Sequence, residues 1–226
     1  TADITIASGV RLTVRGNTTL SQCILTQEAG AIYEFDASQA ATPLSQNYWL
    51  LLSIDWGGLA WAQSNGTAEA RCSFESNVAG GNGFIDTYST PVGTGATRGG
   101  SFRSSTYVDF TRIGDAVNPA IKMTPNNSNY EFSIRHSVWD TCGKLTAYSS
   151  LQANTPFQFE NVTFKNTLAN ECIYLAFGQT PTALRSVQNC VFDKIVTFHT
   201  PVGATLNGNI FNEAFTGTTT AKSASF

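Results

Sequence analysis

Two acidic residues in this 226-residue sequence could do chemistry on a sugar polymer. Carboxyl groups about 5 to 9.5 Å apart can cleave a glycosidic bond, one as acid and one as base or nucleophile. Asp55 and Glu75 occupy the same position in successive copies of a short repeat, which would place them on neighbouring strands. They are the candidate catalytic acids or metal ligands, and the alternative is that both are solvated surface acids.

Three cations share that same repeat position in the copies that follow: Arg103, Arg135 and Lys165. On adjacent strands they would lie about 5 Å apart, where like charges facing each other are destabilising. A stripe of this kind is expected to bind an anionic partner such as a uronic or sulfated sugar. The alternative is that the long side chains turn into water and pair with nearby carboxylates such as Glu75 or Asp193.

Three of the four tryptophans fall close together, at Trp49, Trp56 and Trp61. An exposed row of indoles offers large, rigid surfaces on which the apolar faces of sugar rings can stack. The competing interpretation is that they are core residues, since the surrounding stretch is strongly apolar. Trp56 is expected to be the most exposed because it stands near a turn at the end of its repeat.

These residues depend on a repeated six-residue segment for their positions. Its copies recur every 19 to 32 residues and contain strand-forming residues, which is typical of a solenoid. An apolar fourth position identifies the copies: Ile54, Phe74, Phe102, Ile134, Phe164, Phe192 and Phe211.

Alternation within each copy predicts which side chains face inward, because successive residues of a strand point to opposite faces. The second and fourth positions are mostly apolar and are predicted to face the core. The fifth position is polar throughout and is predicted to face outward. The third position predicts an outward row of hydroxyls in the first five copies, formed by Ser53, Ser73, Ser101, Ser133 and Thr163.

The composition limits the classes of function. Only 13% of residues are charged, and the net charge is −3. This balance gives no general attraction to nucleic acid, so we expect no nucleic-acid partner. No apolar run approaches the roughly 18 residues that a membrane-spanning helix needs, so we expect no membrane span.

The five cysteines are too scattered for a disulfide scaffold, and no CxxC pair suggests zinc. Cys72 and Cys190 fall at inward positions and are predicted to be buried free thiols. Cys142 and Cys172 are one repeat apart and could form a disulfide. His136 and His199 have no visible partner and are expected to be surface or packed side chains rather than ligands or bases.

A single register argues for one domain over residues 1–226. Residues 1–47 are less regular and would form the first coils or a cap, 48–215 the regular coils, and 216–226 a C-terminal tail. The prediction is an all-β protein, a single-stranded right-handed parallel β-helix of about eight coils. Its two ends would expose strand edges, which a homotrimer or adjoining domains would cover.

The segments NVTFKN, NCVF and GNIFN resemble the coils of right-handed parallel β-helix proteins of the pectate-lyase-like superfamily. That group includes polysaccharide lyases, glycoside hydrolases, phage tailspikes and surface adhesins. The sequence has neither the Asp-Asp pair, the Gly-His-Gly nor the Arg-Ile-Lys segment of the polygalacturonase type. A lyase of this superfamily would use Ca²⁺, an ion that takes 6 to 8 oxygen ligands, and here only two acids stand together.

Three functions are therefore expected. The first is a non-catalytic extracellular, cell-surface or virion protein that binds or presents to a polysaccharide or cell-surface glycan. The second is a lyase or hydrolase acting on an acidic polysaccharide. The third is the structural shaft of a phage spike. No cofactor is predicted, apart from Ca²⁺ in the lyase alternative, and no metal site can be assigned.

Overall fold

A computed structural model describes most of the chain, and everything said below of its structure refers to these residues. They are residues 2–16, 18–21, 23–36, 48–54, 61–77, 83–89, 101–124, 131–147, 157–176, 185–199, 204–217 and 219–225. Asp55 and Trp56 lie outside them. The described part is all-β: it contains strands and turns and no helix. This confirms the predicted all-β class.

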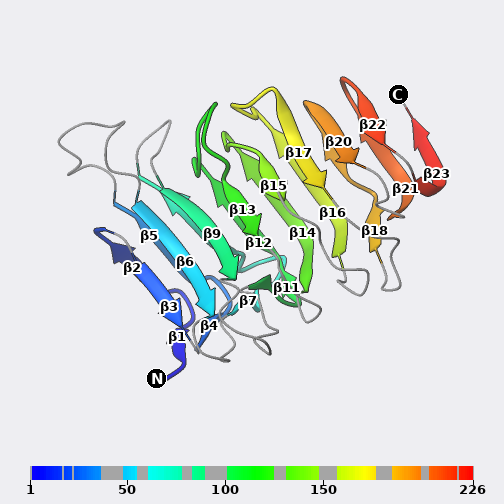
Figure 1. Cartoon of the computed structure of the whole chain (residues 1–226). Helices are drawn as coiled ribbons and strands as arrows, with labels where there is room; N and C mark the ends of the chain where they lie inside the picture. The colour runs from blue at the N-terminus through cyan, green and yellow to red at the C-terminus, as the bar shows by residue number, and fades with distance from the viewer. Residues whose placement is uncertain are drawn as a thin grey trace, which may run out of the picture.

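The strands form three parallel sheets, in which each strand pairs with strands from the preceding and following rounds of the chain (Figure 1). The four-stranded sheet contains β1 (Ile4–Ile6), β4 (Ile24–Gln27), β7 (Trp61–Ser64) and β10 (Ser101–Phe102). The eight-stranded sheet contains β3 (Thr18–Ser21), β6 (Tyr48–Ile54), β9 (Gly83–Ser89), β13 (Ile121–Thr124), β15 (Leu145–Ala147), β17 (Glu171–Ala176), β20 (Ile195–His199) and β22 (Phe215–Gly217).

The largest sheet has eleven strands. They are β2 (Arg11–Val14), β5 (Ile32–Phe35), β8 (Cys72–Ser76), β11 (Ser105–Thr106), β12 (Val108–Thr111), β14 (Phe132–Asp140), β16 (Phe157–Lys165), β18 (Arg185–Gln188), β19 (Val191–Phe192), β21 (Ala204–Phe211) and β23 (Thr219–Ser225). The chain visits the sheets in turn, and β1 and β23 lie at opposite ends of the stack (Figure 1). This topology is compatible with the predicted solenoid.

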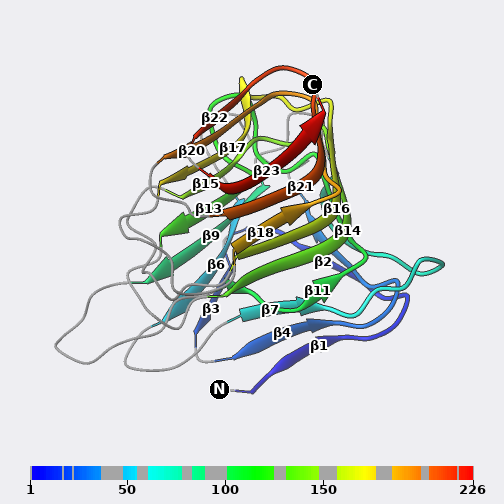
Figure 2. The same ribbon diagram turned by 90° about the vertical axis from the view of Figure 1, so that its right-hand side faces the viewer.

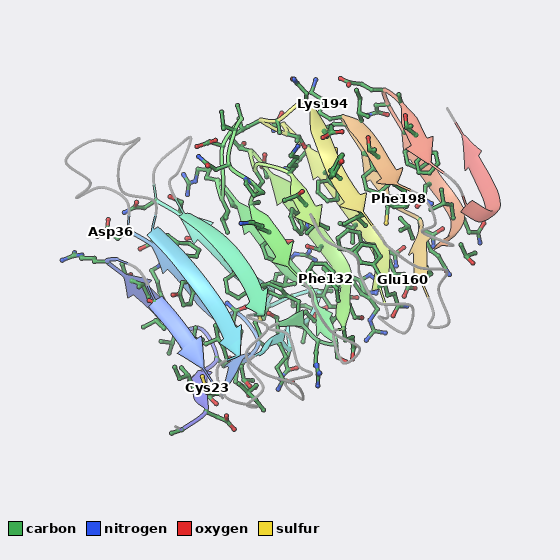
Figure 3. The ribbon with its side chains drawn as sticks, in the orientation of Figure 1. Cys23, Asp36, Phe132, Glu160, Lys194 and Phe198 are labelled. Atoms are coloured by element: carbon green, nitrogen blue, oxygen red, sulfur yellow. The ribbon has the colours of Figure 1, made fainter. Side chains whose placement is uncertain are left out.

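The core lies between the sheets and is built from aromatic rings stacked from strand to strand. The aromatic stack, as we call it, is buried, and its neighbouring ring centroids are 4.4 to 5.6 Å apart. Its members are Tyr33, Phe74, Phe110, Trp139, Phe164, Phe192 and Phe211. Such pairs contribute about 0.5 to 1.5 kcal/mol each beyond the burial of apolar area. Phe132 and Phe198, labelled in Figure 3, are buried as well.

The predicted inward positions are confirmed wherever side chains are described. At the second position Cys72, Phe132, Val162, Cys190 and even Asn209 are buried, and so are the fourth-position residues from Phe74 onward. Asn209 is accommodated because its amide donates to the Val187 carbonyl and accepts from the Cys190 N–H.

The predicted stacking of the seven copies is wrong in register. Phe164 lies opposite Trp139, whereas Ile134 lies opposite Phe159. Ile54 belongs to β6 of the eight-stranded sheet, and Phe102 to β10 of the four-stranded sheet. The error has a physical cause: β14 and β16 are each nine residues long and bend at a residue with positive φ. Both halves alternate with the same period of two, so alternation alone does not distinguish them.

Replacing Phe164 by alanine tests the aromatic stack. Phe164 packs between Trp139 and Phe192, and it is fully buried, so Phe164→Ala should lower the free energy of unfolding by about 3 to 5 kcal/mol. Urea denaturation measures the change. The matched control is Lys165→Ala at the next, exposed residue, which should cost below about 1 kcal/mol. Equal effects at both positions would contradict this description of the core.

Candidate functional site

The predicted acid pair, Asp55 with Glu75, is not supported by the strand order. Asp55 lies outside the described residues, and the strand before it, β6, pairs with β3 and β9. Glu75 lies on β8, which pairs with β5 and β12 in another sheet. The register from which the pairing was predicted is not the register of these strands, and the position of Asp55 relative to Glu75 stays a prediction.

Glu75 instead faces another acid, Glu34, directly across the strand pair. Like charges in this arrangement are destabilising, and Arg11 offsets the repulsion by donating to both carboxylates. Its hydrogen bond to Glu75 is the main cause that raises the pKa of the Arg11 guanidinium. The pair is thus held as a salt-bridged group, with Ser73 and Thr13 donating to its other oxygens.

The predicted cation stripe is wrong, since its three members lie in different rows. Lys165 faces Asp140, with 3.1 Å between Nζ and Oδ2. Arg135 faces Thr106 on one side and Glu160 on the other. Arg103 follows β10, where its N–H donates to the Ala62 carbonyl.

The predicted hydroxyl row does not form either. Ser73 lies between Ile32 and Asp109, and Thr163 lies between Val138 and Val191. The aligned serines were assigned to one row by the same register error.

The tryptophans are divided between sheets. Trp49 lies on β6 opposite Phe84, and Trp61 lies on β7 opposite Ile24 and Ser101. The backbone therefore does not stack these two in one row. Their side chains and all of Trp56 lie outside what the structure describes, so their exposure stays a prediction.

The structure does bring together a continuous row of polar side chains, which we call the polar stripe. Each member is the direct partner of the next across neighbouring strands. The members are Asn65, Thr106, Arg135, Glu160, Gln188 and Asn207. They lie on the side of the molecule where β7, β11, β14, β16, β18 and β21 follow one another (Figure 2).

Members of the polar stripe are partly or fully exposed, and none has a side-chain hydrogen bond or ion pair within the part of the chain that the structure describes. Asn65 and Asn207, towards its two ends, are exposed, and the others are intermediate. Glu160, labelled in Figure 3, faces Arg135 without forming an ion pair with it. The stripe is thus a row of hydrogen-bonding groups available to a ligand.

A second row, the corner column, follows the polar stripe by one residue and marks where the chain turns between two faces. Its members all have a positive φ of 48° to 65°. They are Tyr107, His136, Asn161, Asn189 and Gly208. Asparagine and glycine tolerate this conformation most readily. At Gly208 a Cβ would also lie 2.4 Å from Oδ1 of Asn189, so any larger residue there would have to displace the Asn189 side chain.

Positive φ costs more free energy at Tyr107 and His136 than at asparagine or glycine, and contacts of their side chains hold these two residues in place. Their rings stack with centroids 4.6 Å apart, and Asn161 Nδ2 donates to Nδ1 of His136 at 3.3 Å. On its other side Tyr107 meets the Arg71 guanidinium, 5.5 Å from the ring centroid. His136 is therefore a packed histidine, which is one of the two outcomes expected from the sequence.

Arg71 locks this corner to the adjacent strands. Its guanidinium donates to both oxygens of Asp109, at 2.7 and 2.6 Å, and to the His136 carbonyl at 2.6 Å. Asp109 also accepts the Val138 N–H. The hydrogen bonds of the Arg71 guanidinium and of the Asp109 carboxylate therefore fix the backbone beside the polar stripe.

The five cysteines are all buried free thiols. This confirms the prediction for Cys72 and Cys190 and corrects the suggested Cys142–Cys172 disulfide. Burial is the main cause that raises the pKa of Cys142 and of Cys190 to about 12. Cys172 donates to Asp193 instead, at 3.2 Å, and burial raises its pKa as well.

Within the described ranges, no three histidine, cysteine, aspartate or glutamate side chains are grouped so that they could hold a metal ion. The same residues contain no helix with the length and apolar character that crossing a bilayer requires.

Sequence reasoning selected Arg135 but missed the rest of the polar stripe. A usable signal was present, because four members stand directly before asparagine or glycine: Asn65, Glu160, Gln188 and Asn207. A polar residue followed by Asn or Gly at a strand end indicates an outward side chain next to a turn.

Comparisons with known proteins identify no relative. The chain matches no protein-family model. It matches no curated protein and no solved structure.

The contacts of Asp140 on the outer surface can be tested by the pH dependence of stability. Its pKa is lowered, first by the hydrogen bond from Asn166 and then by Lys165 and Thr141. A carboxylate with a lowered folded-state pKa stabilises the fold above its unfolded pKa, near 3.8, and loses that contribution as the pH falls through the folded value. Asp140→Asn should thus be less stable than the wild type at pH 6, and the gap should narrow at pH 3. Thermal unfolding at both pH values checks this, and a gap independent of pH would contradict it.

Proposed function

We propose that the chain is a right-handed parallel β-helix of about eight coils, of the pectate-lyase-like type. Support comes from the order in which the chain enters the sheets. The sets β1–β2–β3, β4–β5–β6 and β7–β8–β9 repeat the same sequence of sheets, and every pairing between successive sets is parallel. Parallel strands within one sheet need crossover connections, which the other two sheets supply here.

The function we propose is non-catalytic binding of a polysaccharide or cell-surface glycan by an extracellular, cell-surface or virion protein. The polar stripe carries this proposal. Amide side chains both donate and accept, as Asn65, Gln188 and Asn207 do, and sugar hydroxyls need both kinds of partner. The row repeats at the strand spacing of about 4.8 Å, so it offers one polar group after another along a chain-like ligand.

The enzymatic alternative, a lyase or hydrolase for an acidic polysaccharide, has less support. A glycosidase needs one carboxyl group with a raised pKa to protonate the leaving oxygen. Glu34 and Glu75 are both ion-paired to Arg11. The pKa of Asp140 is lowered rather than raised, mainly by the hydrogen bond from Asn166. These contacts favour a ligand-binding surface over an acid catalyst.

Glycan binding should depend on the neutral end of the polar stripe. The glycans to test are those that bind the wild-type protein on a glycan array. A Gln188→Ala/Asn207→Ala double variant should bind them more weakly, by about 1 to 3 kcal/mol, because two hydrogen-bonding groups are removed. Asn212→Ala is the control, since this exposed residue lies beside the stripe-bearing strand but outside the stripe. The same glycans are assayed for new reducing ends and unsaturated uronates. Release of product would favour the enzyme, and an unchanged affinity of the double variant would contradict the role of the stripe.

One observation favours a second candidate, the structural shaft. An outward row on the eleven-stranded sheet becomes apolar toward the C-terminal end, where Val138, Thr163, Val191 and Ile210 are successive partners. Ile210 is 43% exposed. An apolar row running along the axis is a surface that further copies of the chain could cover in a homotrimer.

Sedimentation equilibrium tests the shaft. If copies associate through this row, the wild type should sediment as an oligomer and Ile210→Asp should shift it to the monomer. Asn212→Asp is the matched control, since it adds the same charge two residues further along and should leave the oligomer intact. A wild type that stays monomeric at high concentration would exclude this candidate.

A further inference from the structure

Arg135 and Glu160 are the two charged members of the polar stripe and lie on the adjacent strands β14 and β16. Farther along the same two strands, Asp140 and Lys165 are also direct partners, and they do form an ion pair at 3.1 Å. Arg135 and Glu160 form none, and neither side chain has another hydrogen-bonding or ionic partner among the residues described. The strands β14 and β16 thus carry one ion pair, Asp140 with Lys165, and one pair of facing opposite charges that form no ion pair. We call the second, Arg135 with Glu160, the open pair.

The open pair has neutral neighbours on both sides. Along the stripe the order is amide, hydroxyl, cation, anion, amide, amide. The Arg135 Nε is buried without a hydrogen-bond partner, so the base of this guanidinium is enclosed by the protein while the residue remains partly exposed. Immobilising it in advance reduces the entropy lost when its fork binds a ligand.

The charge order constrains what can lie along the stripe. A guanidinium fork matches the two oxygens of a carboxylate, in shape as well as in charge. A sugar residue in an extended chain advances by a length similar to the strand spacing of about 4.8 Å. A carboxylate held by Arg135 therefore has its neighbouring sugar over Glu160 or over Thr106. A second carboxylate over Glu160 would meet a like charge, whereas a neutral sugar could donate its hydroxyls to that acid.

We propose that the polar stripe selects a polysaccharide in which uronic acids alternate with neutral sugars, with the uronate carboxylate on Arg135 and a neutral residue on Glu160. This inference rests on the proposed glycan-binding function and adds the class of ligand. Glu160 acts as the discriminating residue, because it opposes any polymer that carries a carboxylate on every sugar. Specificity of this kind comes from a repulsive element as much as from an attractive one.

The test uses oligosaccharides of equal length from three classes. Hyaluronan and unsulfated chondroitin alternate acidic and neutral sugars, oligogalacturonate is acidic at every residue, and chitin oligosaccharides are neutral. Calorimetric titration of the whole chain should give an affinity for the alternating class at least about tenfold above that for oligogalacturonate. Arg135→Gln should reduce binding of the alternating class by about tenfold or more. Glu160→Gln should raise the affinity for oligogalacturonate and leave the alternating class within a few-fold.

Lys165→Gln is the matched control, because it removes a charge from the same strand as Glu160 outside the stripe, and it should change none of these affinities. Unchanged near-ultraviolet dichroism shows that each variant is folded. Equal binding of all three classes, or an oligogalacturonate affinity that Glu160→Gln does not raise, would overturn the selectivity while leaving glycan binding in place. Absence of binding to every class would overturn the proposed function and this inference with it.

Discussion

Parallel stacking in register is the constraint on which the rest of this structure depends. Every side chain lies about 4.8 Å from the residue at the same position in the next strand, so each row must be compatible with itself. Inside, aromatic rings meet this demand by stacking, as in Phe110, Trp139 and Phe164. Outside, charged rows need opposite signs in succession, as in Asp140 and Lys165, or a bridging cation, as Arg11 provides for Glu34 and Glu75.

The polar stripe follows from the same constraint. It stands one residue before the corner column, where the backbone adopts positive φ and the chain turns. Arg71, Tyr107 and His136 hold that corner through stacked rings and hydrogen bonds to Asp109 and a backbone carbonyl. These contacts hold the backbone next to Thr106 and Arg135, two members of the stripe. A ligand that meets it therefore finds polar groups already ordered, which lowers the entropic cost of binding.

Much of the core was predictable from the sequence, and most of the site was not. Alternation identified Phe74, Phe164 and Phe192 as inward residues, because a strand buried on one face must alternate. The stacking order was not accessible in this way. The strand that carries Ile134 also carries Trp139, and period-two alternation fits both halves equally well. Only the pairing of strands shows that Trp139, rather than Ile134, stacks on Phe164.

The residues of the site are obscured in the sequence by the same ambiguity of register. Arg135 was selected from the sequence as a ligand-binding residue, but it was placed in a row with Arg103 and Lys165 that does not exist. Outward residues such as Thr106 and Gln188 are subject to no packing requirement, so no periodic signal marks them. Their alignment appears only when five separate strand pairings are known together.

Glycan recognition by the polar stripe is the central claim, and side-chain NMR tests it most directly. An oligosaccharide that binds the protein is titrated into the isotope-labelled chain. The resonances to follow are those of the side-chain amides of Asn65, Gln188 and Asn207 and of the guanidinium N–H groups of Arg135. The account predicts that these resonances shift together and saturate at one affinity, while the side chains of Asn77 and Asn166, elsewhere on the surface, remain unchanged. Shifts confined to residues outside the stripe, during binding that clearly saturates, would contradict it.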